Sequence, residues 1–287
     1  MIRSFIFIII CLTIVSCQKE TDFNQNPLPP TNNDSIYLDR IDMVENGDTP
    51  LVISFVYDNR KRVVSMVESG TLGDNQTFQY YYSGNDTIPY LMRTITDYPG
   101  ATDTLWTYRY YDAAGRTITD SSIRSTLLQG TSTPDVNTYV TQFSYAPSRI
   151  FSITTLIPTP FNAPFQDVDT SVLDARGNIV QTKTWRTING TTALQATSNF
   201  TYDDKPHPFT FMTNYKMHQD IPSGETIFFE YFPVNNILTQ VETMDGFPSM
   251  DINQSFQYTS NGLPSRVTVN DLGLGETWTL LFKYKAL

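Results

Sequence analysis

Residues 106–116 read Trp-Thr-Tyr-Arg-Tyr-Tyr-Asp-Ala-Ala-Gly-Arg, and this stretch contains the pattern on which the fold depends. Its first half is rich in aromatic residues and alternates along the chain, which is typical of a β-strand. Its second half places Asp112 first and Gly115 fourth, as a type I turn prefers, because Asp bonds the local backbone and Gly accepts a positive φ. The stretch therefore predicts a strand that enters a tight hairpin.

The same phrase returns along the whole chain. Its aromatic anchor recurs at intervals that range from 25 residues, between Tyr57 and Tyr82, to 34 residues, between Tyr111 and Tyr145. A period of this size is typical of a repeat architecture with one supersecondary unit per period. The nine anchors are Tyr57, Tyr82, Tyr111, Tyr145, Leu173 in place of Tyr, Tyr202, Tyr231, Tyr258 and Tyr284.

We therefore predict an all-β fold of about nine consecutive β-hairpin repeats that form a long, curled antiparallel meander sheet. No stretch has convincing helical spacing, and many of the 17 prolines lie between the expected strands. A sheet of about sixteen strands cannot stay flat, which leaves three outcomes open: it coils, closes on itself or folds into a sandwich. The segment from Ile237 to Val241 is expected to follow the Tyr231 anchor as its second strand.

Residues 111–116 resemble the tyrosine-aspartate repeat of the Rhs family, Tyr-Asp-x-x-Gly-Arg, and residues 58–62 and 174–178 are degraded copies. The phrase from Tyr202 to Phe209, with Asn235-Asn236-Ile237 downstream, is similar to one in uncharacterised lipoproteins of Bacteroidota that carry a Rhs-like β domain. The resemblance implies a YD-repeat-like β domain over residues 36–287 and a structural role for the motif. Large Rhs proteins enclose a toxin, but this chain is too short for such a shell, so neither that role nor any functional residue carries over.

The start of the chain is expected to be a lipoprotein leader. Arg3 precedes an apolar run, and Ile14-Val15-Ser16-Cys17 resembles the bacterial lipobox. We predict a signal peptide over residues 1–16, lipidation of Cys17, and a flexible Pro/Asn-rich tether that completes the segment 17–35. Residues 18–22 resemble the signal that exports lipoproteins of Bacteroidota to the cell surface, which predicts a lipid-anchored, surface-exposed protein of the outer membrane.

The composition disfavours several classes of protein. The formal charge is −10, and no basic cluster exceeds Arg60-Lys61-Arg62, so nucleic acid is a poor candidate partner. Cys11 would be lost with the signal peptide and Cys17 would be acylated, which removes disulfides, cysteine nucleophiles and thiolate metal sites from consideration. We predict no cofactor.

The titratable residues do not form a recognisable catalytic motif. His207 lies between two prolines in an expected turn, and His218 could pair with Asp220, but no nucleophile elbow or metal-binding helix accompanies them. Asp167 and Asp169 share one face of an extended segment, which leaves calcium binding or a paired-acid glycosidase as alternatives. We predict no catalytic residue and no metal ligand.

The aromatic residues are the best candidates for binding. The repeated Phe-x-Tyr face is expected to form the core, whereas Tyr81, Trp106, Tyr108 and Trp185 lie on the other phase and could bind a ligand if that face is open to solvent. We predict a non-catalytic binding or scaffolding protein of the cell envelope, with a glycan or an envelope protein as partner. The alternatives are an assembly subunit with a large apolar patch, a glycoside hydrolase with a carboxylate cleft, and a lipid carrier with an empty apolar interior.

Overall fold

The computed structural model of the chain describes residues 36–45, 48–70, 75–158, 164–212, 233–244 and 250–286. The predicted signal peptide, Cys17 and the tether lie outside these residues. The described part forms sixteen strands and one short 3-10 helix, η1 (Pro208–Phe211). The strands are β1 (Ile36–Glu45), β2 (Asp48–Tyr57), β3 (Val63–Gly70), β4 (Asn75–Tyr81), β5 (Leu91–Tyr98), β6 (Ala101–Tyr111), β7 (Thr117–Leu128), β8 (Asp135–Ala146), β9 (Arg149–Ile157), β10 (Phe165–Leu173), β11 (Ile179–Ile188), β12 (Thr191–Pro206), β13 (Asn235–Met244), β14 (Met250–Tyr258), β15 (Pro264–Asp271) and β16 (Glu276–Ala286).

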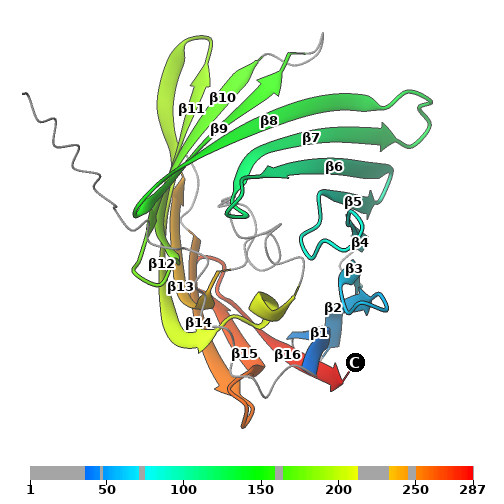
Figure 1. The fold of residues 1–287 in the computed structure, drawn as a ribbon, viewed down its shortest axis with the longest axis vertical. Coiled ribbons are helices and arrows are strands. Elements are labelled where there is room, and N and C mark those ends of the chain that lie inside the picture. The colour runs from blue at the N-terminus through cyan, green and yellow to red at the C-terminus, as the bar shows by residue number, and fades with distance from the viewer. Residues whose placement is uncertain are drawn as a thin grey trace, which may run out of the picture.

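The strands form one closed antiparallel barrel (Figure 1). Each strand pairs with its neighbours in sequence, and β1 pairs with β16, where Ile41 lies opposite Phe282 and Met43 lies opposite Leu280. The predicted all-β antiparallel meander is confirmed, and closure is the outcome among the three left open. Closure pairs the backbone groups that a free sheet edge would leave exposed.

The described residues contain eight of the nine anchors: seven are followed by the second strand of a hairpin, and the strand of the eighth, β16, pairs instead with β1 to close the barrel. Tyr231, the remaining anchor, lies outside the described residues. Residues 237–241 form a strand, as predicted, but the prediction that they are the second strand of the Tyr231 repeat was wrong. They belong to β13, which pairs with β12 and places Thr239 opposite Thr201. The second strand of the Tyr202 repeat therefore begins only at Asn235. The spacing of the aromatic anchors could not show that β12 and β13 are partners.

The turns have the predicted geometry. Gly115 and Gly177 have φ values of 75° and 90°, and the strand register shifts between Tyr110 and Tyr111, as a hairpin with a bulge requires. In the degraded copy at residues 58–62 the position of the glycine is occupied by Lys61, which adopts a φ of 63°. The turn geometry is thus retained where the preferred residue is lost.

Six of the eight anchors in the described residues tie the end of one strand to the start of an earlier strand or to a residue close to that start. Tyr82 donates a hydrogen bond of 2.7 Å to the carbonyl oxygen of Val63, the first residue of β3. Tyr202 donates one of 2.6 Å to Ile179, the first residue of β11. The same contact joins Tyr57 to Leu38, Tyr111 to Pro89, Tyr145 to Thr117 and Tyr284 to Pro264. The repeated tyrosine is therefore structural, because it connects successive units.

One side of the barrel interior is apolar. η1 lies inside the ring (Figure 1), and Phe209 packs edge-on against Phe55 with ring centroids 5.7 Å apart. Both rings are buried, and burial of such side chains is the main stabilising term in folding. The surrounding core includes Leu38, Ile41, Ile53, Met66, Phe78, Ile252, Val267, Val269 and Leu280.

The other side of the interior is polar. Arg109 and Asp120 form a buried ion pair at 3.2 Å, and Arg186 pairs with Asp167 at 2.7 Å. The same inner face passes from apolar to polar along one cross-strand row of directly opposed residues: Phe55, Met66, Phe78, Thr94, Leu105, Arg124 and Asn137.

No helix in the described residues has the length and apolar character needed to cross a bilayer.

Candidate functional site

Four side chains from three adjacent strands gather on the outside of the barrel, and we call Tyr81, Arg93, Trp106 and Tyr108 the outer aromatic cluster. Arg93 on β5 lies directly opposite Trp106 on β6. Their neighbour Thr107 is buried in the interior, so strand alternation turns Trp106 and Tyr108 outward. The rings of Tyr81 and Trp106 are stacked with centroids 6.4 Å apart.

The cluster offers the groups that bind a ring-shaped, partly polar ligand. The guanidinium carbon of Arg93 lies 4.8 Å from the centre of the Trp106 ring, and Tyr81 and Tyr108 are each 36% exposed. The Tyr81 hydroxyl donates to the Gln79 side chain at 3.2 Å. Aromatic faces with polar groups at their edges suit sugars and protein side chains alike. Because the residues stand on strands, their positions are well defined.

Three of the four predicted binding aromatics are thus brought together, and Trp185 is not. Trp185 lies outward on β11, where it is 38% exposed. Two further residues were not among the predicted site residues. Tyr110, 56% exposed, shares the outward phase of Trp106 and could have been found from alternation. Arg93 could not, because only the pairing of β5 with β6 places it beside Trp106.

The cluster shares Trp106 and Tyr108 with a larger surface that we call the outer wall. It consists of the outward-facing residues of β6–β11: even-numbered residues 102–110, 136–144 and 166–172, and odd-numbered residues 119–127, 149–157 and 181–187. Its only charged side chains are Arg149 and Lys183. The carboxylates on these six strands all face the interior: Asp103, Asp120, Asp135, Asp167 and Asp169.

The opposite side of the barrel has the reverse polarity. There the interior is the apolar core, and charged groups lie outside. Asp42 on β1 forms ion pairs with Arg40 and, at 2.5 Å, with Lys283 of β16, and Arg266 on β15 is exposed. Charged residues thus gather on the outside of β15, β16 and β1, whereas the outer wall carries only Arg149 and Lys183.

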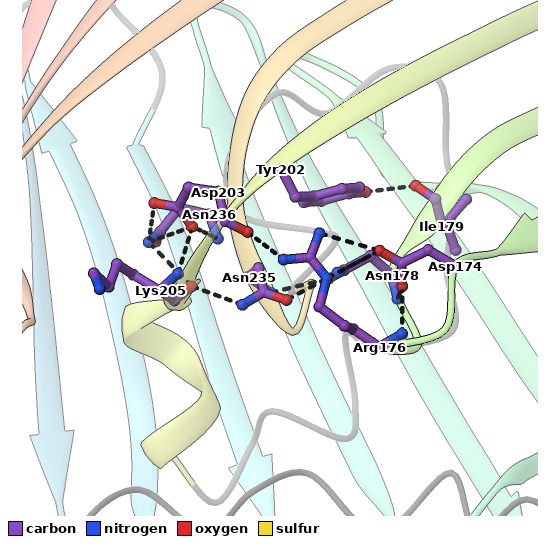
Figure 2. A network of polar contacts seen from close by, with 9 residues as sticks. All are labelled: Asp174, Arg176, Asn178, Ile179, Tyr202, Asp203, Lys205, Asn235 and Asn236. Atoms are coloured by element: carbon purple, nitrogen blue, oxygen red, sulfur yellow. Dashed lines mark hydrogen bonds and ion pairs between the residues drawn. The ribbon is translucent and has the colours of Figure 1, made fainter.

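A dense polar network at one rim is structural (Figure 2). The Asp203 carboxylate accepts hydrogen bonds from the backbone and side chain of Asn236 and from the Tyr258 hydroxyl. Burial and this carboxylate raise the pKa of Tyr258. Asn178 and Asn235 exchange two hydrogen bonds of 2.9 Å. The network fastens the start of β13 to the end of β12 and to the β10–β11 turn, so Asp203, Asn235 and Asn236 have a structural role.

The turn interpretation of His207 is confirmed, since its Nδ1 accepts a hydrogen bond from the backbone of Phe209 at the start of η1. The residue is partly buried, its ring packs against Phe209 at 5.1 Å, and desolvation lowers the pKa of the imidazole to about 3. His218 and Asp220 lie outside the described residues.

Asp167 and Asp169 point into the barrel and have protein partners. Asp167 is paired with Arg186, and Asp169 accepts hydrogen bonds from Ser152 and Thr184 at 3.0 and 2.6 Å. Burial raises the pKa of Asp169, and these two hydrogen bonds offset part of the rise. Among the described residues, no group of three or more His, Cys, Asp or Glu side chains is arranged to hold a metal ion.

Comparison with solved structures supports the barrel. The chain is similar to a porin-like protein from Bacteroides vulgatus ATCC 8482, with a TM-score of 0.53 and 12% identity over 88% of this chain and 100% of that one. A porin-like protein from Bacteroides uniformis ATCC 8492 matches with a TM-score of 0.43 and 13% identity over 86% and 98% of the two chains. No protein-family model matches the chain, and no curated protein is similar to it in sequence. At 12% identity the likeness concerns the fold alone.

Proposed function

We propose that this chain is a lipid-anchored, non-catalytic binding protein of the outer membrane that holds its ligand on the outer aromatic cluster. The observation that carries the proposal is the gathering of Tyr81, Trp106 and Tyr108 around Arg93 on the outside of the barrel. Exposed rings with polar neighbours are what a glycan-binding surface requires, and carbohydrate is the ligand we favour.

The charged side chains on the outside of the barrel favour a barrel that lies in water and is attached to the membrane by the lipid on Cys17. If the barrel crossed a membrane, Arg40, Arg266 and Lys283 would have to face the hydrocarbon or its borders. An Arg or Lys on the lipid face costs about 2–4 kcal/mol at the midplane. Acylation of Cys17 and a tether over residues 18–35 would instead keep the whole barrel outside the bilayer.

The test is a binding screen with the chain that begins at residue 18, since the barrel closes between β1 and β16 without earlier residues. We expect retention on one or more carbohydrates of a glycan array, and affinity about tenfold weaker in Trp106→Ala and Tyr108→Ala. Tyr98→Ala, which removes an exposed aromatic at the far end of β5, is the matched control. Ligand hydrolysis, or binding that none of these changes affects, would contradict the proposal.

A second candidate is an assembly subunit, which the outer wall favours. The outer wall has no carboxylate, and Ile123, Val136 and Ile153 are between 37% and 42% exposed on it. Protein interfaces are likewise depleted of charge and contain exposed apolar side chains. A photo-crosslinking residue at Ile153 would then capture one defined envelope protein in intact cells, whereas the same residue at Thr268, on the charged side, would not.

A further inference from the structure

We infer that the ligand is an uncharged, extended polysaccharide that lies across β6–β11, with the outer aromatic cluster near one end of its path and Trp185 at the other. This inference rests on the proposed function, because it names the ligand class and the extent of the same surface.

Strand pairing places two exposed rings at the ends of one row. Tyr110 on β6 and Trp185 on β11 are joined by directly opposed residues on every strand between them. Five interstrand spacings of about 4.8 Å separate them by roughly 24 Å, which is the length of a short oligosaccharide rather than a single sugar. The row is Tyr110, Thr119, Gln142, Ile153, Val168 and Trp185.

The residues between the two rings match the surface of a sugar chain. Thr119 and Gln142 offer hydroxyl and amide groups, and Ile153 and Val168 offer apolar contacts. A polysaccharide presents the same mixture, with hydroxyl groups at the edges of its rings and C–H groups on their faces. A lipid bilayer would leave the amide of Gln142 without partners, at a cost of about 1–3 kcal/mol or more.

The charge distribution selects against ionic ligands. The chain has a formal charge of −10, so an acidic polymer is repelled over long range. A cationic ligand finds no carboxylate on the outer wall. The two basic residues of the wall do not belong to the row, since Lys183 lies opposite Thr170 and Arg149 opposite Val172. An uncharged polymer meets neither a favourable nor an unfavourable charge along the row.

The experiment compares ligand lengths in two variants. Affinities for disaccharides and octasaccharides of β-1,4-glucan, β-1,4-mannan, β-1,4-xylan and α-1,4-glucan are measured by calorimetry. We expect the octasaccharide of one series to bind about tenfold more tightly than its disaccharide. Trp185→Ala should abolish that gain and leave the disaccharide unaffected, whereas Trp106→Ala should weaken both. Trp185→Phe should restore the gain in part, and Tyr98→Ala should change nothing.

Each failure has a distinct meaning. If Trp106→Ala weakens binding and Trp185→Ala has no effect at any length, the extended site is wrong and the proposed function stands. Preference for polygalacturonate, lost in Arg93→Gln or in about 0.5 M NaCl, would overturn the uncharged class. Binding to phosphatidylcholine vesicles that Trp106→Ala and Trp185→Ala both weaken would make the surface a membrane contact. Failure of every carbohydrate to bind would contradict both proposals.

Discussion

The hydroxyl of Tyr82 donates to the carbonyl oxygen of Val63, and the guanidinium of the adjacent Arg62 lies over the same tyrosine ring at 4.4 Å. One tyrosine is thus held by the backbone and the side chain of the preceding hairpin. The relationship recurs at Tyr145, which donates to Thr117 and lies under Arg116 at 5.0 Å. In both repeats the Arg that ends the turn contacts the Tyr of the next repeat, which gives a physical reason for the recurrence of the two residues together.

Replacement of Tyr82 by Phe should destabilise the barrel by about 1 kcal/mol. The change removes the hydrogen bond to Val63 and keeps the ring, and the net value of such a bond is about 0.5–1.5 kcal/mol. Urea unfolding provides the measurement. Tyr81→Phe is the control, because the Tyr81 hydroxyl makes an exposed hydrogen bond to the Gln79 side chain, and the effect of its removal should stay within about 0.5 kcal/mol. Equal effects of the two changes would show that the contact between repeats adds no stability.

Asp112 should contribute stability that disappears in acid. Burial alone would raise the pKa of its carboxyl, but hydrogen bonds from the backbone and guanidinium of Arg116 bring the pKa below its usual value. A lowered pKa in the folded state stabilises above the unfolded value of about 3.9, and this stability is lost as the pH falls through the folded value.

We therefore expect Asp112→Asn to lower the free energy of unfolding at pH 7 and to reduce the further loss in stability below about pH 4. Asp204→Asn, at a side chain that is 82% exposed, serves as the control and should leave both quantities unchanged. An Asp112→Asn variant with the acid sensitivity of the parent would disprove the assignment.

His207 should make the barrel less stable as the pH falls below neutrality. Its pKa is about 3 in the folded chain and about 6.5 when unfolded, so the unfolded chain takes up a proton first. Stability is then complete above about pH 6.5 and declines toward the folded value. His207→Gln, which keeps an acceptor for the Phe209 backbone, should flatten this decline between about pH 6.5 and 4. An imidazole NMR signal of His207 that titrates near pH 6.5 would contradict the prediction.

Phe209→Ala tests whether η1 belongs to the barrel core. The ring is 2% exposed and packs on Phe55, so its removal should cost about 3–5 kcal/mol through lost burial and a residual cavity. Leu272→Ala, at a side chain that is 60% exposed, should cost less than about 0.5 kcal/mol. A change in melting temperature no larger than that of the control would place η1 outside the cooperative unit.

The local repeating unit of the fold could be predicted from the amino-acid pattern alone. Alternation and turn chemistry act within about ten residues, so the strand before Asp112, the positive φ of Gly115 and the inward phase of Phe78 and Tyr80 could all be predicted. The outward phase of Trp106 and Tyr108 followed from the same alternation. Local rules gave no reason to expect Lys61 at a position suited to glycine.

The way in which the repeating units meet depends on pairing between strands that are far apart in the chain. Pairing of Ile41 with Phe282, across almost the whole chain, closes the barrel. β13 pairs with β12, although the spacing of the anchors assigned residues 237–241 to the Tyr231 repeat. The same long-range pairing sets Arg93 beside Trp106 and aligns Tyr110 with Trp185. Such contacts depend on which strands become neighbours, and a pattern of period two is the same for every choice of neighbour.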